Sequence, residues 1–219
     1  MHPLKSTLCM DSVEMLTKTW VESYNISSDP TPQAVADYNE PCGLTAREIA
    51  IRTIILQGIV AVGAEVDPVP IKSWFRDQQI WDMVSPNEKV FLANSSPTDD
   101  ERIKFRWHQE AEWALLWAIG KVEHLGLPTK CCDTARLVDE IIPALGSNID
   151  DFLDSAQFRP PGVLLAEDDR TYNMWSYAQS SYRDGTLPKD LNWGVLYERR
   201  YAFEWLDGNQ DWDEVTCDA

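Results

Sequence analysis

The sequence predicts an all-α protein, a compact bundle of helices packed around one long central helix rich in tryptophan. Apolar side chains recur mainly at spacings of three and four residues, which is the period of an amphipathic helix. Three segments begin with Ser or Thr followed three residues later by Glu, a pattern that caps helix starts. No two segments of alternating polarity are joined by an Asn-Gly or Asp-Gly turn, so the sequence predicts no β-hairpin.

The three capping patterns fix the first predicted helices. They are Thr45 with Glu48, Ser85 with Glu88, and Thr98 with Glu101. The first predicts a helix to about residue 63, and the second a short helix in which Pro86 takes the first helical position. The third opens the longest predicted helix, to about residue 125, where Gly126 and Pro128 should stop it.

Apolar spacing predicts the other helices. They cover residues 11–24, 32–38, a short segment from Pro70 to Trp81, 134–142, 149–156, 162–183 and 193–206. The connections are short, and no internal repeat or low-complexity linker divides the chain. We therefore expect a single helical domain over residues 1–219.

The predicted helix over residues 98–125 should form the centre of the bundle. Its apolar positions form a broad stripe, and Trp113 and Trp117 widen that stripe to most of the helix surface. A helix that is apolar on most sides is a buried one.

The charge balance excludes two classes of partner. The chain has 19 Lys and Arg against 36 Asp and Glu, a net charge of −17. Proteins that bind nucleic acid through phosphate contacts need a basic surface, and so does direct adhesion to anionic membranes. The excess negative charge is unevenly distributed along the sequence. Residues 1–132 carry a net charge of −6, and residues 133–219 carry a net charge of −11. Such a skew indicates an acidic face.

Cysteine usage and hydropathy favour a cytoplasmic location. The chain has five cysteines, an odd number, and Cys131 and Cys132 are adjacent, which suits neither a disulfide framework nor a zinc site. No secretory signal is visible at the start of the sequence. No apolar run reaches the length of a membrane span. We expect reduced thiols and no membrane segment.

Neither a metal site nor a cofactor is predicted. His108 and His124, placed on one helix, would lie about 160° apart around its axis, too far to share a metal. His108 and Glu112 have helical i,i+4 spacing and are interpreted as a surface pair. The tail from Asp207 resembles a calcium loop but has Trp212 where the sharp turn needs Gly. No nucleophile or phosphate-loop motif is present, so no catalytic residue is assigned.

Carboxylate clusters are the most numerous polar feature. Residues 99–101 and 150–151 fall at predicted helix starts, where negative charge offsets the helix dipole. Glu167, Asp168 and Asp169 lie inside a predicted helix instead. They could do acid–base chemistry or form a solvated face that Arg170 partly neutralises.

Several segments resemble a known family. They are residues 46–52, 59–62, 110–121 and 198–206, the segment of Trp74 and Trp81, the Cys132-Asp133 step, and Asp211-Trp212-Asp213. Together they look like the bacterial family called domain of unknown function 4272. The similarity spans a core of residues 45–218, and the first 40 residues carry less of the pattern. The resemblance implies a mostly helical domain and no agreed activity.

Four charged residues fall in these family-like segments within otherwise apolar helices. They are Arg52, Glu110, Arg199 and Arg200. Buried Arg–Glu pairs are one interpretation, and an anion-binding pocket is the other.

Three functions are compatible with these observations. The first is a non-catalytic acidic module, most concretely an immunity-type or antitoxin-like protein that masks a basic toxin surface. The second is an enzyme that uses Glu110 or the cluster Glu167–Asp169, and the third is a ligand-binding or scaffold domain with an aromatic surface.

Overall fold

The computed structural model describes residues 21–23, 43–208 and 210–217, and within them the prediction of an all-α fold is confirmed. These residues form helices, turns and loops and include no strand. The helices are α3 (Ala46–Gly63), α4 (Pro68–Asp77), α5 (Pro86–Ala93), α6 (Asp99–Ala118), α7 (Thr134–Arg136), α8 (Asp150–Asp154), α9 (Pro161–Arg183) and α10 (Trp193–Leu206). Shorter turns of helix cover Trp81–Met83, Leu137–Ile141 and Trp212–Glu214.

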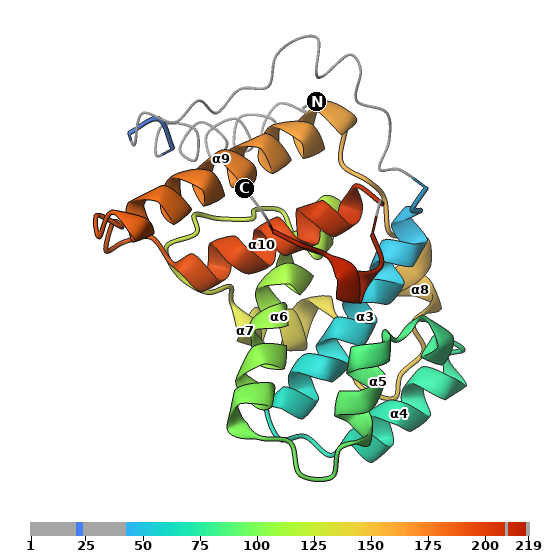
Figure 1. Cartoon of the computed structure of the whole chain (residues 1–219). Coiled ribbons are helices and arrows are strands. Elements are labelled where there is room, and N and C mark those ends of the chain that lie inside the picture. Colours follow the sequence, from blue (N-terminus) through green and yellow to red (C-terminus); the bar gives the residue numbers. More distant parts are fainter. Residues whose placement is uncertain (1–20, 24–42, 209, 218–219) are drawn as a thin grey trace, which may run out of the picture.

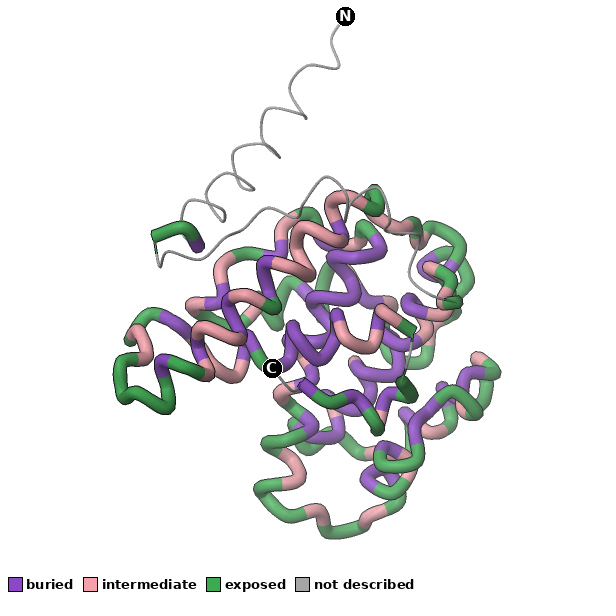
Figure 2. The backbone as a smooth tube through the Cα atoms, turned by 45° about the horizontal axis from the view of Figure 1, so that its top comes forward, coloured by how far each residue is buried: buried purple, intermediate pink, exposed green. Residues whose placement is uncertain are grey.

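The centre of the fold is a pair of helices, α3 and α6, that lie side by side (Figure 1). Helix α10 packs against α6, and α9 packs on α10. Helices α4 and α5 contact α3, as does α8. Figure 2 shows buried backbone concentrated where these helices meet. The predicted central helix therefore shares its place with α3, in which 12 of 18 residues are buried.

The three capping boxes form as predicted. Thr45, Ser85 and Thr98 each accept a hydrogen bond from the backbone N–H of the glutamate three residues on. Each glutamate accepts a bond from the cap residue's own N–H in return. Helix α10 also has the predicted bounds.

Helix α6 ends at Ala118, seven residues before the predicted end. Gly120 adopts a left-handed backbone conformation with φ of 74°, and Lys121 N–H donates to the carbonyl of Leu116, which closes the helix. Val122 and Leu125 are buried in the loop that follows, so the apolar pattern continues although the helix does not. With 23 residues, α9 is the longest described helix, and the prediction that α6 would be longest is wrong.

Two further boundaries differ from prediction. Helix α4 begins at Pro68 rather than Pro70, because Asp67 caps it by accepting from the N–H of Val69. Trp81 lies beyond its end, in a separate turn of helix. The predicted helix over residues 32–38 lies outside the described residues, as does the one over 11–24 except for residues 21–23.

Two further expectations concern the membrane and the cysteines. Among the described residues, no helix is long and apolar enough to cross a membrane. The three described cysteines, Cys131, Cys132 and Cys217, are free thiols.

Candidate functional site

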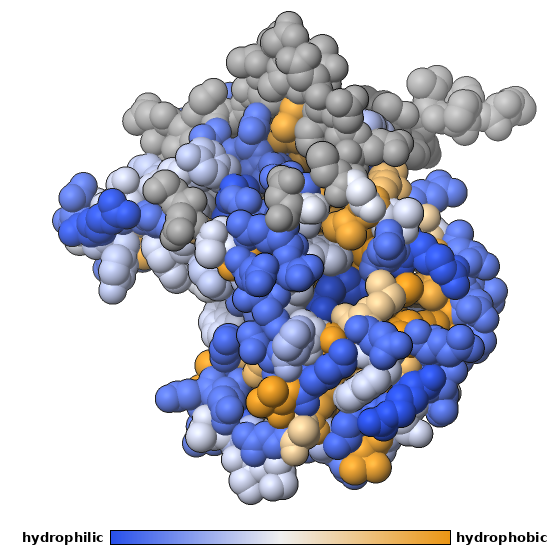
Figure 3. Space-filling view, turned by 45° about the vertical axis from the view of Figure 1, so that its right-hand side comes forward, coloured by the Kyte–Doolittle hydropathy of each residue, from blue (hydrophilic) through white to orange (hydrophobic). Residues whose placement is uncertain are grey.

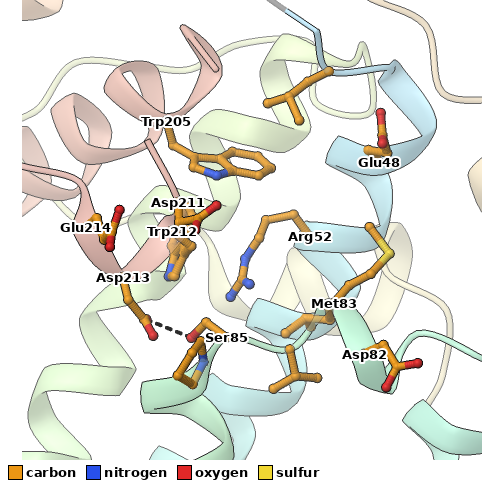
Figure 4. Close-up of a pocket in the computed structure, with 14 residues that line it drawn as sticks. Glu48, Arg52, Asp82, Met83, Ser85, Trp205, Asp211, Trp212, Asp213 and Glu214 are labelled. Atoms are coloured by element: carbon orange, nitrogen blue, oxygen red, sulfur yellow. Dashed lines mark hydrogen bonds between the residues drawn. The ribbon is translucent and has the colours of Figure 1, made fainter. Parts of the chain in front are cut away.

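Three of the family-like segments meet at one cavity, although they are far apart in the sequence. The cavity has a volume of about 390 Å³. Its walls come from the first half of α3, residues 82–86, Trp205 of α10 and residues 211–214 (Figure 4). We call it the acid-rimmed pocket, because five of its lining residues are acidic and one, Arg52, is basic.

Arg52 projects from α3 into this pocket and is neutralised there. Its guanidinium forms a buried ion pair with Glu88 of α5, and the side chains are 4% and 0% exposed. The carboxylate of Glu88 also caps α5 by accepting from Ser85 N–H. The guanidinium carbon lies 4.3 Å from the centre of the Trp212 ring, in cation–π contact. Arg52 therefore has both a counter-ion and an aromatic cover.

Residues 211–214 form one wall of the pocket because Asp213 ties them to the start of α5. Its carboxylate accepts from the hydroxyl of Ser85 at 2.7 Å and from the N–H of Asn87 at 2.8 Å. A carboxylate at a helix N-terminus is favoured by the helix dipole. The hydroxyl of Tyr201 donates to the carbonyl of Trp212, which is itself buried.

The rim of the pocket is acidic, and one wall is aromatic. Asp82, Asp211 and Glu214 are exposed and form no ion pair with any residue that the structure describes. Trp205 is half-buried, and its ring meets that of Trp212 edge-on at 5.4 Å. Exposed carboxylates beside an indole are a binding environment for an organic cation.

The charges also disfavour an anion at Arg52. An anion placed there would meet the field of the five carboxylates, whereas Glu88 already neutralises the guanidinium. The charges of the pocket therefore favour a cationic group over an anion on electrostatic grounds.

A buried His–Glu pair lies behind the pocket. The Nδ1 atom of His108 is 2.9 Å from Glu198 Oε2, and the His108 ring lies edge-on to Trp212 at 5.9 Å. The predicted surface pair of His108 with Glu112 is wrong, because both residues are buried. His124 lies in the loop after α6 and not on that helix, because the helix ends early.

Glu110 and Arg199 meet in a second place, between α6 and α10. Their closest atoms are 3.9 Å apart, and both side chains are buried. Arg199 donates to the carbonyls of Gly126 and Leu125 at 2.6 and 3.0 Å. Glu110 accepts from the N–H of Cys132 at 2.6 Å. This group lies outside the acid-rimmed pocket.

The cluster Glu167–Asp169 lies in a third place, between α9 and α10. Arg200 pairs with Asp168 at 2.8 Å and also with Glu204, and Arg170 pairs with Glu167. Burial raises the pKa of Asp168 to about 6, although the charge of Arg200 opposes the shift. The Asp168–Arg200 pair therefore joins the two helices, whereas the Glu167–Arg170 pair lies within α9 and Asp169 forms no ion pair with a described residue.

The seven candidate residues from the sequence therefore do not form one site. Arg52 lies apart, whereas the Glu110–Arg199 pair and the cluster Glu167–Asp169 are neighbours, because Glu167 and Arg199 line one small cavity. Only Arg52 lines the acid-rimmed pocket. Residue-type reasoning missed Asp211 as a pocket residue, although it lies in a family-like segment. Trp205 is one of the aromatic residues on which the ligand-binding hypothesis depends. Within the described part of the chain, no three His, Cys, Asp or Glu side chains are grouped to hold a metal.

Comparisons with known proteins give one result. No curated protein and no solved structure matches the sequence. One family matches residues 16–215, nearly the whole chain. The chain belongs to this family, which is described as domain of unknown function 4272.

Proposed function

We propose that this protein is a non-catalytic acidic module whose pocket takes a basic side chain of a protein partner. The observation that carries the proposal is the acid-rimmed pocket, which exposed Asp82, Asp211 and Glu214 line together with the half-buried indole of Trp205. The most concrete form is an immunity-type or antitoxin-like protein that masks a basic surface of a bacterial toxin.

The chemistry of the pocket fits an arginine or lysine side chain. An indole face attracts a cation, and carboxylates at the mouth can pair with its nitrogen atoms. The volume of about 390 Å³ accommodates one such side chain. The net charge of −17 would accelerate association with a basic partner over longer distances.

The part of the face that Figure 3 shows in colour gives less support to docking through a large apolar patch. Figure 3 shows the face that comes forward when the right-hand side of Figure 1 is turned to the viewer. That face is mainly hydrophilic, and its apolar side chains form small separate groups. A large apolar contact area would favour the scaffold hypothesis, and this face does not offer one.

A peptide binding experiment tests the pocket. The probe is a ten-residue peptide of alternating arginine and glycine, and its control is the same peptide with neutral citrulline. We expect the double variant Asp211→Asn/Glu214→Gln to bind the arginine peptide about fivefold more weakly than the wild type. The matched control is Asp139→Asn/Asp184→Asn, which removes the same charge from exposed positions elsewhere. Equal weakening in both double variants would show that net charge alone acts, and would contradict the proposal.

If the protein is an immunity-type protein, a further prediction concerns its neighbouring genes. A gene next to the one for this protein should encode a toxin with a basic surface. The wild type should inhibit that toxin at a one-to-one ratio, and Asp211→Asn/Glu214→Gln should need a higher concentration. A neighbouring metabolic operon without a toxin would count against the immunity form while leaving the peptide result intact.

A further inference from the structure

A second cavity is lined mainly by α6 and does not share a lining residue with the acid-rimmed pocket. Its volume is about 380 Å³. It opens between the first half of α6 and the loop before α7, and Arg106, Trp107, Gln109, Glu110 and Cys131 line it. This size suits a small molecule of metabolite dimensions.

Glu110 supplies a buried acidic group to this cavity. Its side chain is 2% exposed, and Oε1 accepts from Cys132 N–H. Oε2 has no hydrogen-bond partner, because Arg199 directs its Nη atoms to two backbone carbonyls and stays 3.9 Å away. A carboxylate oxygen can accept two hydrogen bonds, so Glu110 retains acceptor capacity.

The Glu110–Arg199 pair contains two unsatisfied atoms. The described residues contain eight buried side-chain nitrogen or oxygen atoms without a hydrogen-bond partner, and Glu110 Oε2 and Arg199 Nε are two of them. Buried polar groups are normally satisfied, so an unpartnered carboxylate oxygen of a residue that lines a cavity indicates a group that a bound molecule can complete.

The mouth of the cavity carries the opposite charge. Arg106 lies one helical turn before Glu110, is exposed, and forms no ion pair with another described residue. Residues four apart on a helix share one face, with Cβ atoms about 6 Å apart. Trp107 is half-buried, lines the same cavity and packs its ring against Gly194, where a Cβ atom would come within 2.5 Å of it. The indole is therefore held in place.

We propose that this cavity binds a small amphoteric molecule, with a cationic nitrogen group on Glu110 and an acidic group on Arg106. Free amino acids with a basic side chain have this combination. A guanidinium group fits best, because it pairs with a carboxylate through two hydrogen bonds and stacks on an indole. The inference does not depend on the function proposed for the acid-rimmed pocket.

The test is an NMR titration of the whole chain with L-arginine and with agmatine, which has the same guanidinium but no carboxylate. We expect L-arginine to bind in the millimolar range or tighter and to shift the Trp107 indole and Cys131 amide signals. The variant Arg106→Gln should bind L-arginine about fivefold more weakly and agmatine unchanged. Lys104→Gln, an exposed charge on the same helix that does not line the cavity, is the matched control and should bind as the wild type does.

Three results would overturn the inference. One is the absence of shifts at about 20 mM L-arginine, a concentration well above a millimolar Kd. Another is equal weakening by Arg106→Gln and Lys104→Gln. The third is a set of shifts confined to the indoles of Trp205 and Trp212, which would place the ligand in the acid-rimmed pocket. The variant Asp211→Asn/Glu214→Gln can be titrated with L-arginine in the same way. If its Trp107 signal shifts as it does in the wild type, the result supports binding in the second cavity, whatever the outcome of the peptide experiment.

Discussion

Glu112 is a buried carboxyl group in α6 whose cost of burial is not offset by a hydrogen bond or an ion pair with a described residue. It is 0% exposed, and neither carboxylate oxygen has a hydrogen-bond partner. Burial raises its pKa well above the usual range, so the folded protein holds a proton that the unfolded chain releases. The stability that this proton provides is present below pH 4.5, near the unfolded pKa, and is lost as the pH rises toward the folded pKa.

We predict that Glu112→Leu raises the free energy of unfolding by about 1–3 kcal/mol at pH 8. The gain should shrink toward pH 5, because the free-energy cost of protonating the wild-type carboxyl on folding is smaller there. Urea unfolding at the two pH values measures this. A stability difference that does not change with pH would contradict the assignment of a protonated Glu112.

Trp117 is the residue of α6 on which its place in the core depends most. The side chain is buried, its ring meets Phe203 of α10 edge-on at 6.1 Å, and the guanidinium of Arg159 lies 4.8 Å above it. Trp117→Ala should lower the free energy of unfolding by about 3–5 kcal/mol. Trp81→Ala, at a half-buried indole in the short turn of helix after α4, should cost less. Equal thermal midpoints for wild type and Trp117→Ala would contradict a central position.

Sequence reasoning recognised buried charges but not their partners. Arg52 and Arg199 stand among apolar helix residues, which is the local sign of a buried ion. The partner of Arg52 is Glu88, which the sequence identifies only as a helix cap. The partner of His108 is 90 residues away, whereas helical spacing pointed to Glu112. Ion-pair partners on different helices depend on tertiary packing, which the spacing of residues along one helix does not predict.

At the level of the elements, α3 and α4 approach each other closely at Gly58. A Cβ atom there would lie 2.4 Å from Cζ of Phe75 and 2.9 Å from Cγ2 of Ile71. Gly58→Ala should therefore lower stability by about 1–3 kcal/mol, although Ala normally favours a helix. In a second variant, Phe75→Leu should make the added Gly58→Ala cost smaller, because it removes the clashing ring edge. Additive losses in the double variant would contradict the packing explanation.

Helix starts were predictable, whereas one important helix end was not. The caps at Thr45, Ser85 and Thr98 are local chemistry, so the sequence alone locates them. The end of α6 depends on the left-handed turn at Gly120, and the buried residues beyond it keep a helix-like apolar pattern. The acid-rimmed pocket was not predictable either, because it needs α3, α5 and α10 to be placed together.

For the whole molecule, carboxyl groups that are fully or partly buried and those that cap helices contribute to the pH dependence of stability in opposite senses. The pKa values of Asp168, Asp169, Asp207 and Glu112 are raised, mainly by burial. Each contributes stability at low pH that is lost as the pH rises through its folded pKa, which for Asp168 is about 6. Glu48 and Glu101 act in the opposite sense, because hydrogen bonds from Thr45 and Thr98 lower their pKa values. Their contribution is lost only below the usual carboxyl range.

The thermal midpoint should therefore be higher near pH 5.5 than at pH 8. Added salt should raise it at pH 8, because it screens repulsion within a chain of net charge −17. Calorimetry at both pH values, with and without salt, measures this. Asp168→Asn should reduce the pH dependence, whereas Asp139→Asn, at an exposed position, should leave it unchanged. A midpoint that rises from pH 5.5 to pH 8 would contradict the effect of the buried acids.

The contacts of residues 211–214 have a consequence for how the protein is made. Asp213 and Trp212 join helices that the ribosome produces more than 100 residues earlier, because Ser85 and Arg52 precede them by 128 and 160 positions. While the chain is being synthesised, α3 and α5 can pair through Arg52 and Glu88 before the indole that covers them exists. The pocket is therefore absent from every nascent chain that does not yet include residues 211–214. Any partner that recognises the pocket can bind only after nearly all of this sequence has been translated.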